Sequence, residues 1–253
     1  MTGIRLEHAA LTHEGRVRAN NEDAYCERPD EGLFVVADGM GGHEGGEWAS
    51  AVIADTLASV SLPAGFDDAS LAVAAALHRA NAVIFAEAQA RGVQMGSTAV
   101  ALLVREGRFA VLWVGDSRAY LSRDGQLVRL SHDHTQVQEL IDRGLLSPDD
   151  ADGHPMSHVL ARAMGVREVV EVDVIADDVE SGDVFLLCSD GLMARVDDRE
   201  IAAVLDQPDP DVRTQRLVKL TLDRGAPDNV TVITVGVPQT TLLRLQPVHL
   251  VAR

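Results

Sequence analysis

The stretch Leu33-Phe34-Val35-Val36-Ala37-Asp38-Gly39 decides the fold, because it joins an apolar run directly to a carboxylate. An uninterrupted apolar run of this length is typical of a strand that is buried on both faces. Asp38 stands where the run ends, and a carboxylate at the mouth of a buried strand is costly unless a partner compensates its charge. The stretch therefore predicts a strand that delivers an acidic group to a site.

Two other apolar runs carry an aspartate at one end. Asp190 follows the run 184–189, and Asp228 precedes the run 230–235. If these strand ends converge with the end that carries Asp38, the mutual repulsion of the three carboxylates requires a cation. Hard oxygen ligands favour Mg²⁺ or Mn²⁺ over zinc.

The simpler interpretation of an Asp-Gly pair is a hairpin turn. Asp124-Gly125 fits that interpretation, since it lies between two short alternating segments. The glycine-rich stretch 39–46 is too long for a hairpin and predicts a place where the backbone approaches a ligand closely.

Composition limits the class of protein. The 253 residues are 46% apolar and 24% charged, with a formal net charge of −17. Such a charge disfavours nucleic acid and anionic membranes as partners. Without a run of about 18 consecutive apolar residues, the sequence predicts a cytoplasmic protein. Cys26 and Cys188 fall in or beside apolar runs and are expected to be reduced core residues.

The order of the predicted elements indicates an α+β fold with four layers, α-β-β-α, in which two antiparallel sheets are flanked by helix pairs. Helices are expected at 47–60, 67–90, 136–143, 198–205 and 211–224. Strands are expected at 33–37, 98–104, 108–114, 118–122, 126–130, 169–174, 184–188 and 230–237. One domain would span 4–238, with an irregular flap at about 131–165 and a C-terminal strand or tail at 239–253.

Six short motifs occur in order along these elements. They are Arg18-x-x-Asn21-Glu22-Asp23, Val36-Ala37-Asp38-Gly39-Met40-Gly41-Gly42-His43, Gly96-Ser97-Thr98-Ala99, Val114-Gly115-Asp116-Ser117-Arg118, Ser189-Asp190-Gly191-Leu192 and Asp228-Asn229-Val230-Thr231. Together they resemble the metal-dependent serine/threonine protein phosphatases of the PPM (protein phosphatase 2C) family. The Met-Gly-Gly-His form is similar to the bacterial branch.

The resemblance implies a role for each matching residue. Asp38 would bridge two metal ions, either Mn²⁺ or Mg²⁺, and the carbonyl of Gly39 would help hold the second. The other ligands implied are Asp190 and Asp228 for the first ion, Asp116 together with Asp190 for a third and weaker site, and Asp23 through metal-bound water.

Arg18 would grip the substrate phosphate, for which a surface ion pair is the ordinary alternative. The family reaction, attack of a metal-bridging water on phosphorus, needs no nucleophilic side chain. His43 could protonate the leaving oxygen, or it could be an exposed loop residue.

The function implied is hydrolysis of phosphoserine and phosphothreonine on proteins, opposing a bacterial Ser/Thr kinase. Phosphorylated proteins would be the partners of a monomer, with neither nucleic acid nor membrane among them. The alternatives are a catalytically dead relative that serves as a binding or scaffold module, and a phosphatase dedicated to one regulatory partner. The acidic set and Arg18 argue against the first alternative.

Overall fold

The computed structural model describes residues 5–41, 44–151, 154–157 and 159–238. Its strands are β1 Glu7–His13, β2 Asp23–Arg28, β3 Leu33–Met40, β4 Gly96–Ser97, β5 Ala99–Arg105, β6 Arg108–Val114, β7 Arg118–Arg123, β8 Gln126–Arg129, β9 Asp173–Asp178, β10 Val184–Cys188 and β11 Val230–Gly236. Its α-helices are α1 Glu44–Ser59, α2 Phe66–Arg91, α3 Gln136–Asp142, α4 Asp190–Met193, α5 Asp198–Leu205 and α6 Pro210–Asp223. Two 3₁₀ turns, Pro29–Glu31 and Pro148–Asp150, complete the described elements.

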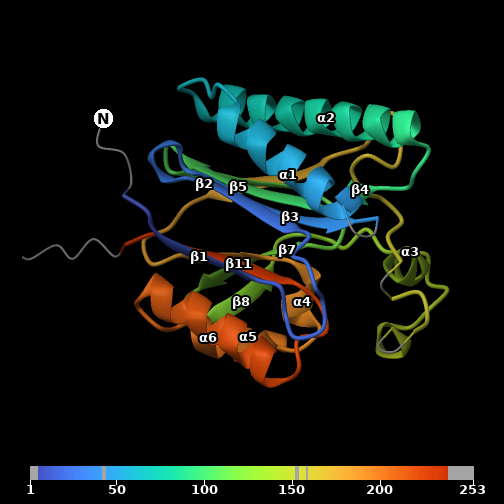
Figure 1. Cartoon of the computed structure of the whole chain (residues 1–253). Coiled ribbons are helices and arrows are strands. Elements are labelled where there is room, and N and C mark those ends of the chain that lie inside the picture. Colours follow the sequence, from blue (N-terminus) through green and yellow to red (C-terminus); the bar gives the residue numbers. More distant parts are fainter. Residues whose placement is uncertain (1–4, 42–43, 152–153, 158, 239–253) are drawn as a thin grey trace, which may run out of the picture.

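The strands form two antiparallel sheets that face each other. One has the order β1-β11-β10-β7-β8, and the other has the order β2-β3-β5-β6-β9 with β4 paired to β3. Helices α1 and α2 cover the outer face of the second sheet, whereas α5 and α6 cover that of the first (Figure 1). The predicted four-layer α-β-β-α architecture is confirmed.

The strand β3 shows why the decisive run is apolar on every residue. Leu33, Val35 and Ala37 pack beneath α1 and α2. Phe34 and Val36 pack into the core between the two sheets. Both faces of β3 are therefore removed from water, which is the main source of stability for such a layer.

The helix α2 is long and apolar enough to cross a membrane by length and composition alone. Its buried residues recur at helical spacing and belong to the core that it shares with α1 and the sheet beneath. Its amphipathic pattern, with Asp67, Asp68 and Arg91 among the exposed residues, is accounted for by this packing.

Three expectations about elements meet different outcomes. The Asp124-Gly125 hairpin turn is confirmed, and both residues have positive φ, 52° and 74°, as a type I′ turn requires. The prediction of a strand at 169–174 is wrong in its bounds, because the strand β9 begins at Asp173 and continues to Asp178. It pairs with β6 in antiparallel register. Val170 is instead buried against the helical layer outside any strand. The C-terminal strand or tail expected at 239–253 lies outside the described residues.

Candidate functional site

One cavity of about 910 Å³ opens at the edge where β3, β10 and β11 meet. Four aspartates line it, namely Asp38, Asp116, Asp190 and Asp228. Asp38 lies near the end of β3 in one sheet, whereas Asp190 and Asp228 flank the neighbouring strands β10 and β11 of the other. The structure thus brings together the strand ends that the sequence suggested.

Glu22 also lines this cavity, and the β2–β3 pair adds a fifth aspartate beside it. Asp23 lies directly opposite Asp38 in the antiparallel register. Its Oδ2 accepts hydrogen bonds from Ser189 Oγ at 2.8 Å and from Thr231 Oγ1 at 2.7 Å. Its Oδ1 is buried without a hydrogen-bond partner among the described residues. A buried carboxylate oxygen with no donor is an unsatisfied acceptor that a cation or its water could complete.

The backbone around Asp38 is fixed by the segment that precedes β5. The Asp38 N–H donates to Thr98 Oγ1 at 3.1 Å, and the Asp38 carbonyl accepts from Thr98 N at 2.8 Å and from Ser97 Oγ at 2.9 Å. Thr98 Oγ1 in turn lies 2.6 Å from Ser117 Oγ. The Gly-Ser-Thr motif therefore holds the aspartate in place and connects it to the turn that carries Asp116.

Gly39 is required for a reason other than the expected approach to a ligand. A Cβ at this position would lie 2.1 Å from the carbonyl oxygen of Gly46 and 2.6 Å from that of Glu22. The Gly39 N–H donates to the Glu22 carbonyl at 3.0 Å. The glycine thus allows the start of α1 and the end of β3 to touch, backbone against backbone.

Mutual repulsion and burial act on the acidic cluster. Burial, and then the charge of Asp190, raises the pKa of Asp116 to about 7. Burial likewise raises the pKa of Asp23 to about 7, although its bonds to Thr231 and Ser189 oppose the shift. The pKa of Asp38 lies well above its usual range, again through burial first and neighbouring carboxylates second. Several carboxyl groups with raised pKa values in one cleft are typical of a functional site.

Two arginines are the only cationic side chains among the described residues that line the cavity. Arg18 Nη2 donates to Asp228 Oδ2 at 2.7 Å, and both side chains are well exposed, at 57% and 36%. The hydrogen bond to Asp228 is the largest cause of the raised pKa of Arg18. Arg195, which follows α4, was missed in the sequence because no motif marks it; only its place on the cavity wall reveals it.

Two further residues, His43 and Asn229, bear on the site. His43, the candidate general acid, lies outside the described residues. Asn229 also lines the cavity, and its role as an anchor was not predicted. Its amide accepts from Glu22 N at 2.8 Å and donates to the carbonyls of Asn20 and Glu14 at 2.8 and 2.9 Å. It fastens the N-terminal loop to the start of β11, and the Asp-Asn pair was the available signal.

The donor set fits divalent cations. All five clustered acids offer hard oxygen ligands, and three of them have pKa values raised by burial and by one another. Among the described residues, no three acidic, histidine or cysteine side chains already stand in a complete ligating arrangement.

Comparison with known proteins agrees with this geometry. The protein phosphatase 2C family profile matches residues 12–221, and the chain belongs to this family. It is 37% identical over 245 residues to the serine/threonine protein phosphatase PstP of Mycobacterium tuberculosis, covering 96% of this chain and 47% of PstP. The chain thus spans about half the length of that relative. It is 32% identical over 234 residues to the serine/threonine phosphatase stp of Listeria monocytogenes, covering 88% of this chain and 93% of stp.

Solved structures share the fold over nearly the whole chain. PppA, described as a key regulatory component of T6SS in Pseudomonas aeruginosa, aligns with a TM-score of 0.86 and 42% identity, covering 92% of this chain and 99% of PppA. The catalytic domain of PstP in complex with two manganese ions aligns with a TM-score of 0.84 and 37% identity, covering 94% of this chain and all of that domain. The resemblance inferred from the six motifs is confirmed.

Proposed function

We propose that this chain is a metal-dependent protein phosphatase that hydrolyses phosphoserine and phosphothreonine on proteins. One observation carries the proposal: five aspartates gather at one cavity whose described lining holds only two cations, Arg18 and Arg195. Such an excess of buried negative charge is unfavourable for the protein alone and suits a site for divalent ions. Membership of the protein phosphatase 2C family supports the same activity.

The ligand assignment follows from position. Asp38 stands between the two sheets and is proposed to bridge two ions, with the Gly39 carbonyl beside it. Asp190 and Asp228 would complete the first site, and Asp116 with Asp190 would form a third. Asp23 would receive metal-bound water through its free Oδ1. When bound, Mn²⁺ or Mg²⁺ would supply a nucleophilic water and neutralise the charge that develops on phosphorus.

The protein's own side chains would bind and orient the substrate. Arg18 sits at the mouth of the cavity, where its guanidinium can grip a phosphate with the remaining N–H groups. Ser189 and Thr231 hold Asp23 so that its second oxygen faces the cluster. His43 remains the proposed proton donor to the leaving seryl or threonyl oxygen.

The substrates and setting are also proposals. The relatives are named as serine/threonine phosphatases, which supports phosphorylated proteins as substrates, including the Ser/Thr kinase that this enzyme would oppose. Segment 131–165 would contact the protein part of the substrate as a flap. A cytoplasmic monomer that binds neither nucleic acid nor membrane is consistent with the charge of −17. A dead scaffold module is not favoured, because the whole acidic set is present.

The test is hydrolysis of a phosphothreonine peptide by the purified chain. We expect activity with added Mn²⁺, loss of activity with EDTA, and recovery when Mn²⁺ is restored. Hydrolysis by a metal-activated water needs the ions and no nucleophilic side chain, so removing the ions should remove the activity. Full activity in metal-free protein would contradict the proposal.

A further inference from the structure

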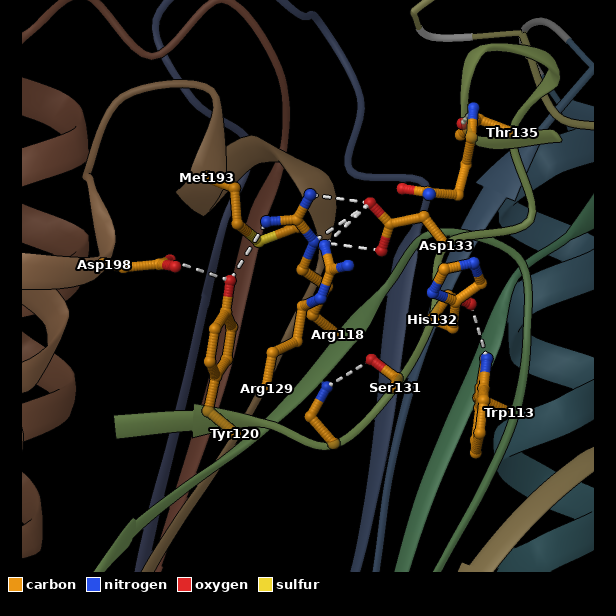
Figure 2. A network of polar contacts seen from close by, with 12 residues as sticks. Trp113, Arg118, Tyr120, Arg129, Ser131, His132, Asp133, Thr135, Met193 and Asp198 are labelled. Atoms are coloured by element: carbon orange, nitrogen blue, oxygen red, sulfur yellow. Dashed lines mark hydrogen bonds and ion pairs between the residues drawn. The ribbon is translucent and has the colours of Figure 1, made fainter. Parts of the chain in front are cut away.

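Residues 131–135, which we call the strap, lie along the turn 115–119 that carries Asp116. Ser131 Oγ accepts from Ala119 N at 3.0 Å. Asp133 accepts three hydrogen bonds from Arg118, at 2.6 to 3.1 Å. Figure 2 shows Arg118 between Tyr120 and Asp133, with the Trp113 indole donating to the His132 carbonyl. The strap thus fixes both ends of the turn and continues into α3.

His134 makes the contact nearest to Asp116. Its ring Nδ1 accepts from Gly115 N at 3.0 Å. Its backbone N–H donates to the Gly115 carbonyl at 2.9 Å. Because Nδ1 is the acceptor, the ring proton must lie on Nε2, which faces Asp173 Oδ2 at 3.2 Å. The ring is 6% exposed and stacks on Trp113, with the ring centroids 6.1 Å apart.

The same residue joins the two ends of the excursion 131–165. Ala161 N donates to the His134 carbonyl at 2.8 Å, and Thr135 forms a bridge with Leu160. Arg162 Nη1 donates to Asp173 Oδ1 at 2.5 Å, so the carboxylate that accepts from His134 is also held by the far end of the excursion.

Gly115 has little freedom to compensate if this support is lost. Its φ is +103°, in the region that favours glycine, and a Cβ there would lie 2.6 Å from the side chain of Thr98. Thr98 itself holds Asp38. A rotation of the Gly115–Asp116 peptide would therefore move Asp116 away from the cluster.

We propose that His134 is a positioning residue that holds Gly115 from both sides, its ring accepting from the Val114–Gly115 amide and its backbone N–H donating to the Gly115–Asp116 carbonyl, so that Asp116 faces the cavity. The ring thereby couples the Asp116 metal site to residues 131–135 and 160–162, which meet at His134 and Asp173. This inference rests on the proposed function, because it requires Asp116 to be a metal ligand. His134 does not touch the substrate. It acts through the Gly115 amide on one side and through Asp173 on the other.

Two substitutions of His134 distinguish its contact with Gly115 from its contact with Asp173. In His134→Asn, the amide oxygen stands as many bonds from Cα as Nδ1 and can accept from Gly115 N. In His134→Gln, the amide reaches instead to the position of Nε2, so that it can contact Asp173 but leaves the Gly115 N–H unpaired. His132→Gln is the matched control, because this neighbouring ring bonds the exposed Asp142 at 2.9 Å and not the turn.

The measurement is Mn²⁺ binding to each folded protein by titration calorimetry, with Asp116→Asn as the reference for loss of the weaker site. We expect His134→Gln to weaken that site about tenfold, as changes behind a ligand often do. His134→Asn and His132→Gln should stay within about threefold of wild type. The stronger sites should be unchanged in all three variants.

Equal binding by His134→Gln and wild type, or equal losses in His134→Asn and His134→Gln, would overturn the inference. Absence of Mn²⁺ binding in the wild type would instead refute the proposed function. Should a variant fail to fold, hydrogen exchange in the wild type decides: protection of 115–119 and 131–146 should rise together as the weaker site fills with Mg²⁺. If the hydrogen-exchange protection of 131–146 stayed unchanged while this site filled with Mg²⁺, the proposed coupling would be wrong.

Discussion

The two ends of the sheet sandwich hold cavities of similar size, about 910 and 860 Å³. They differ in whether a buried carboxylate is paired with an arginine. At the end described above, aspartates face one another. At the other end, Asp183 is 1% exposed and accepts from Arg123 Nε and Nη2, each at 2.7 Å. Arg123 also meets Glu180 at 2.8 Å.

Each end also has an arginine at an end of β7, which makes the contrast sharp. Arg118 pairs with Asp133, and although its charge acts against the shift, burial and Asp190 still raise the pKa of Asp116 on the same turn. Arg123, in contrast, neutralises the buried carboxylate of Asp183 directly. Neither cavity size nor formal charge therefore distinguishes the two ends, because each cavity is lined by five acidic residues and two arginines. The first end differs in that burial and neighbouring carboxylates raise the pKa values of its aspartates, as at Asp38 and Asp116.

The largest expected effect is that of Asp38→Asn. Removing the central carboxylate should lower kcat/KM by about a thousandfold or more, because this residue is proposed to bridge two ions. The metal-free variant should be as stable as wild type or more stable, since repulsion within the cluster falls. Hydrolysis of para-nitrophenyl phosphate with Mn²⁺ and urea unfolding with EDTA measure the two quantities. If more than about a tenth of kcat/KM survived, equal to a loss below about 1.4 kcal/mol, Asp38 would not be a ligand.

The opposite pattern is expected for Asp183→Asn at the other end. Breaking this buried ion pair should cost about 3 kcal/mol of unfolding free energy, at the lower end for such pairs because Glu180 still faces Arg123. Activity per folded molecule should stay within about twofold of wild type, since no proposed ligand is touched. Urea unfolding and para-nitrophenyl phosphate hydrolysis test both statements. A stable but inactive Asp183→Asn would remove the contrast between the two ends.

Sequence reasoning identified the aspartates of the site but not the side chains that hold them, for a physical reason. Asp38, Asp190 and Asp228 each adjoin a strand that is apolar on both faces, so local pattern and chemistry agree. The partners of Asp23, in contrast, are Ser189 and Thr231, which lie 166 and 208 residues away along the chain. Only the sheet topology brings them together.

Edge elements were harder to predict for a related reason. In β9 the exposed acidic residues carry no apolar alternation, and the strand is defined by its pairing with β6. The preceding valines looked more like a strand but lie outside one, with Val170 buried and Val169 exposed. His134 likewise stood among several histidines of an irregular segment, and neither its burial nor its contact with Gly115 could be inferred from spacing.

The third prediction concerns how the free energy of unfolding depends on pH. The folded-state pKa values of Asp23 and Asp116 are raised to about 7, whereas an unfolded aspartate titrates near 4. The folded protein therefore binds more protons in this range. The stability that these two groups contribute is fully present below about pH 4 and is lost as the pH rises through about 7.

In EDTA, we expect the free energy of unfolding to fall by about 2 kcal/mol from pH 4 to pH 7, less than full linkage gives because the coupled acids share protons. Asp23→Asn should reduce this slope, because one of the two carboxyl groups with a raised pKa is removed. Denaturant midpoints measured across this pH range provide the test. A flat profile for wild type would mean that water or relaxation already relieves the cluster.

The smallest expected change in stability comes from Arg18→Ala, which compares the two arginine–carboxylate pairs directly. The Arg18–Asp228 pair has nearly the same length as Arg123–Asp183, 2.7 Å in both, but its side chains are 57% and 36% exposed. Exposed pairs contribute at most about 1 kcal/mol, so the urea midpoint should barely move. In contrast, kcat/KM for a phosphothreonine peptide should fall about tenfold or more, because a phosphate contact is lost. Arg18→Lys should recover part of the affinity but not the two-point grip of a guanidinium. If Arg18→Ala instead lost stability and kept its kcat/KM, the pair with Asp228 would be structural, and the arginine that meets the phosphate would have to be Arg195 on the same cavity wall.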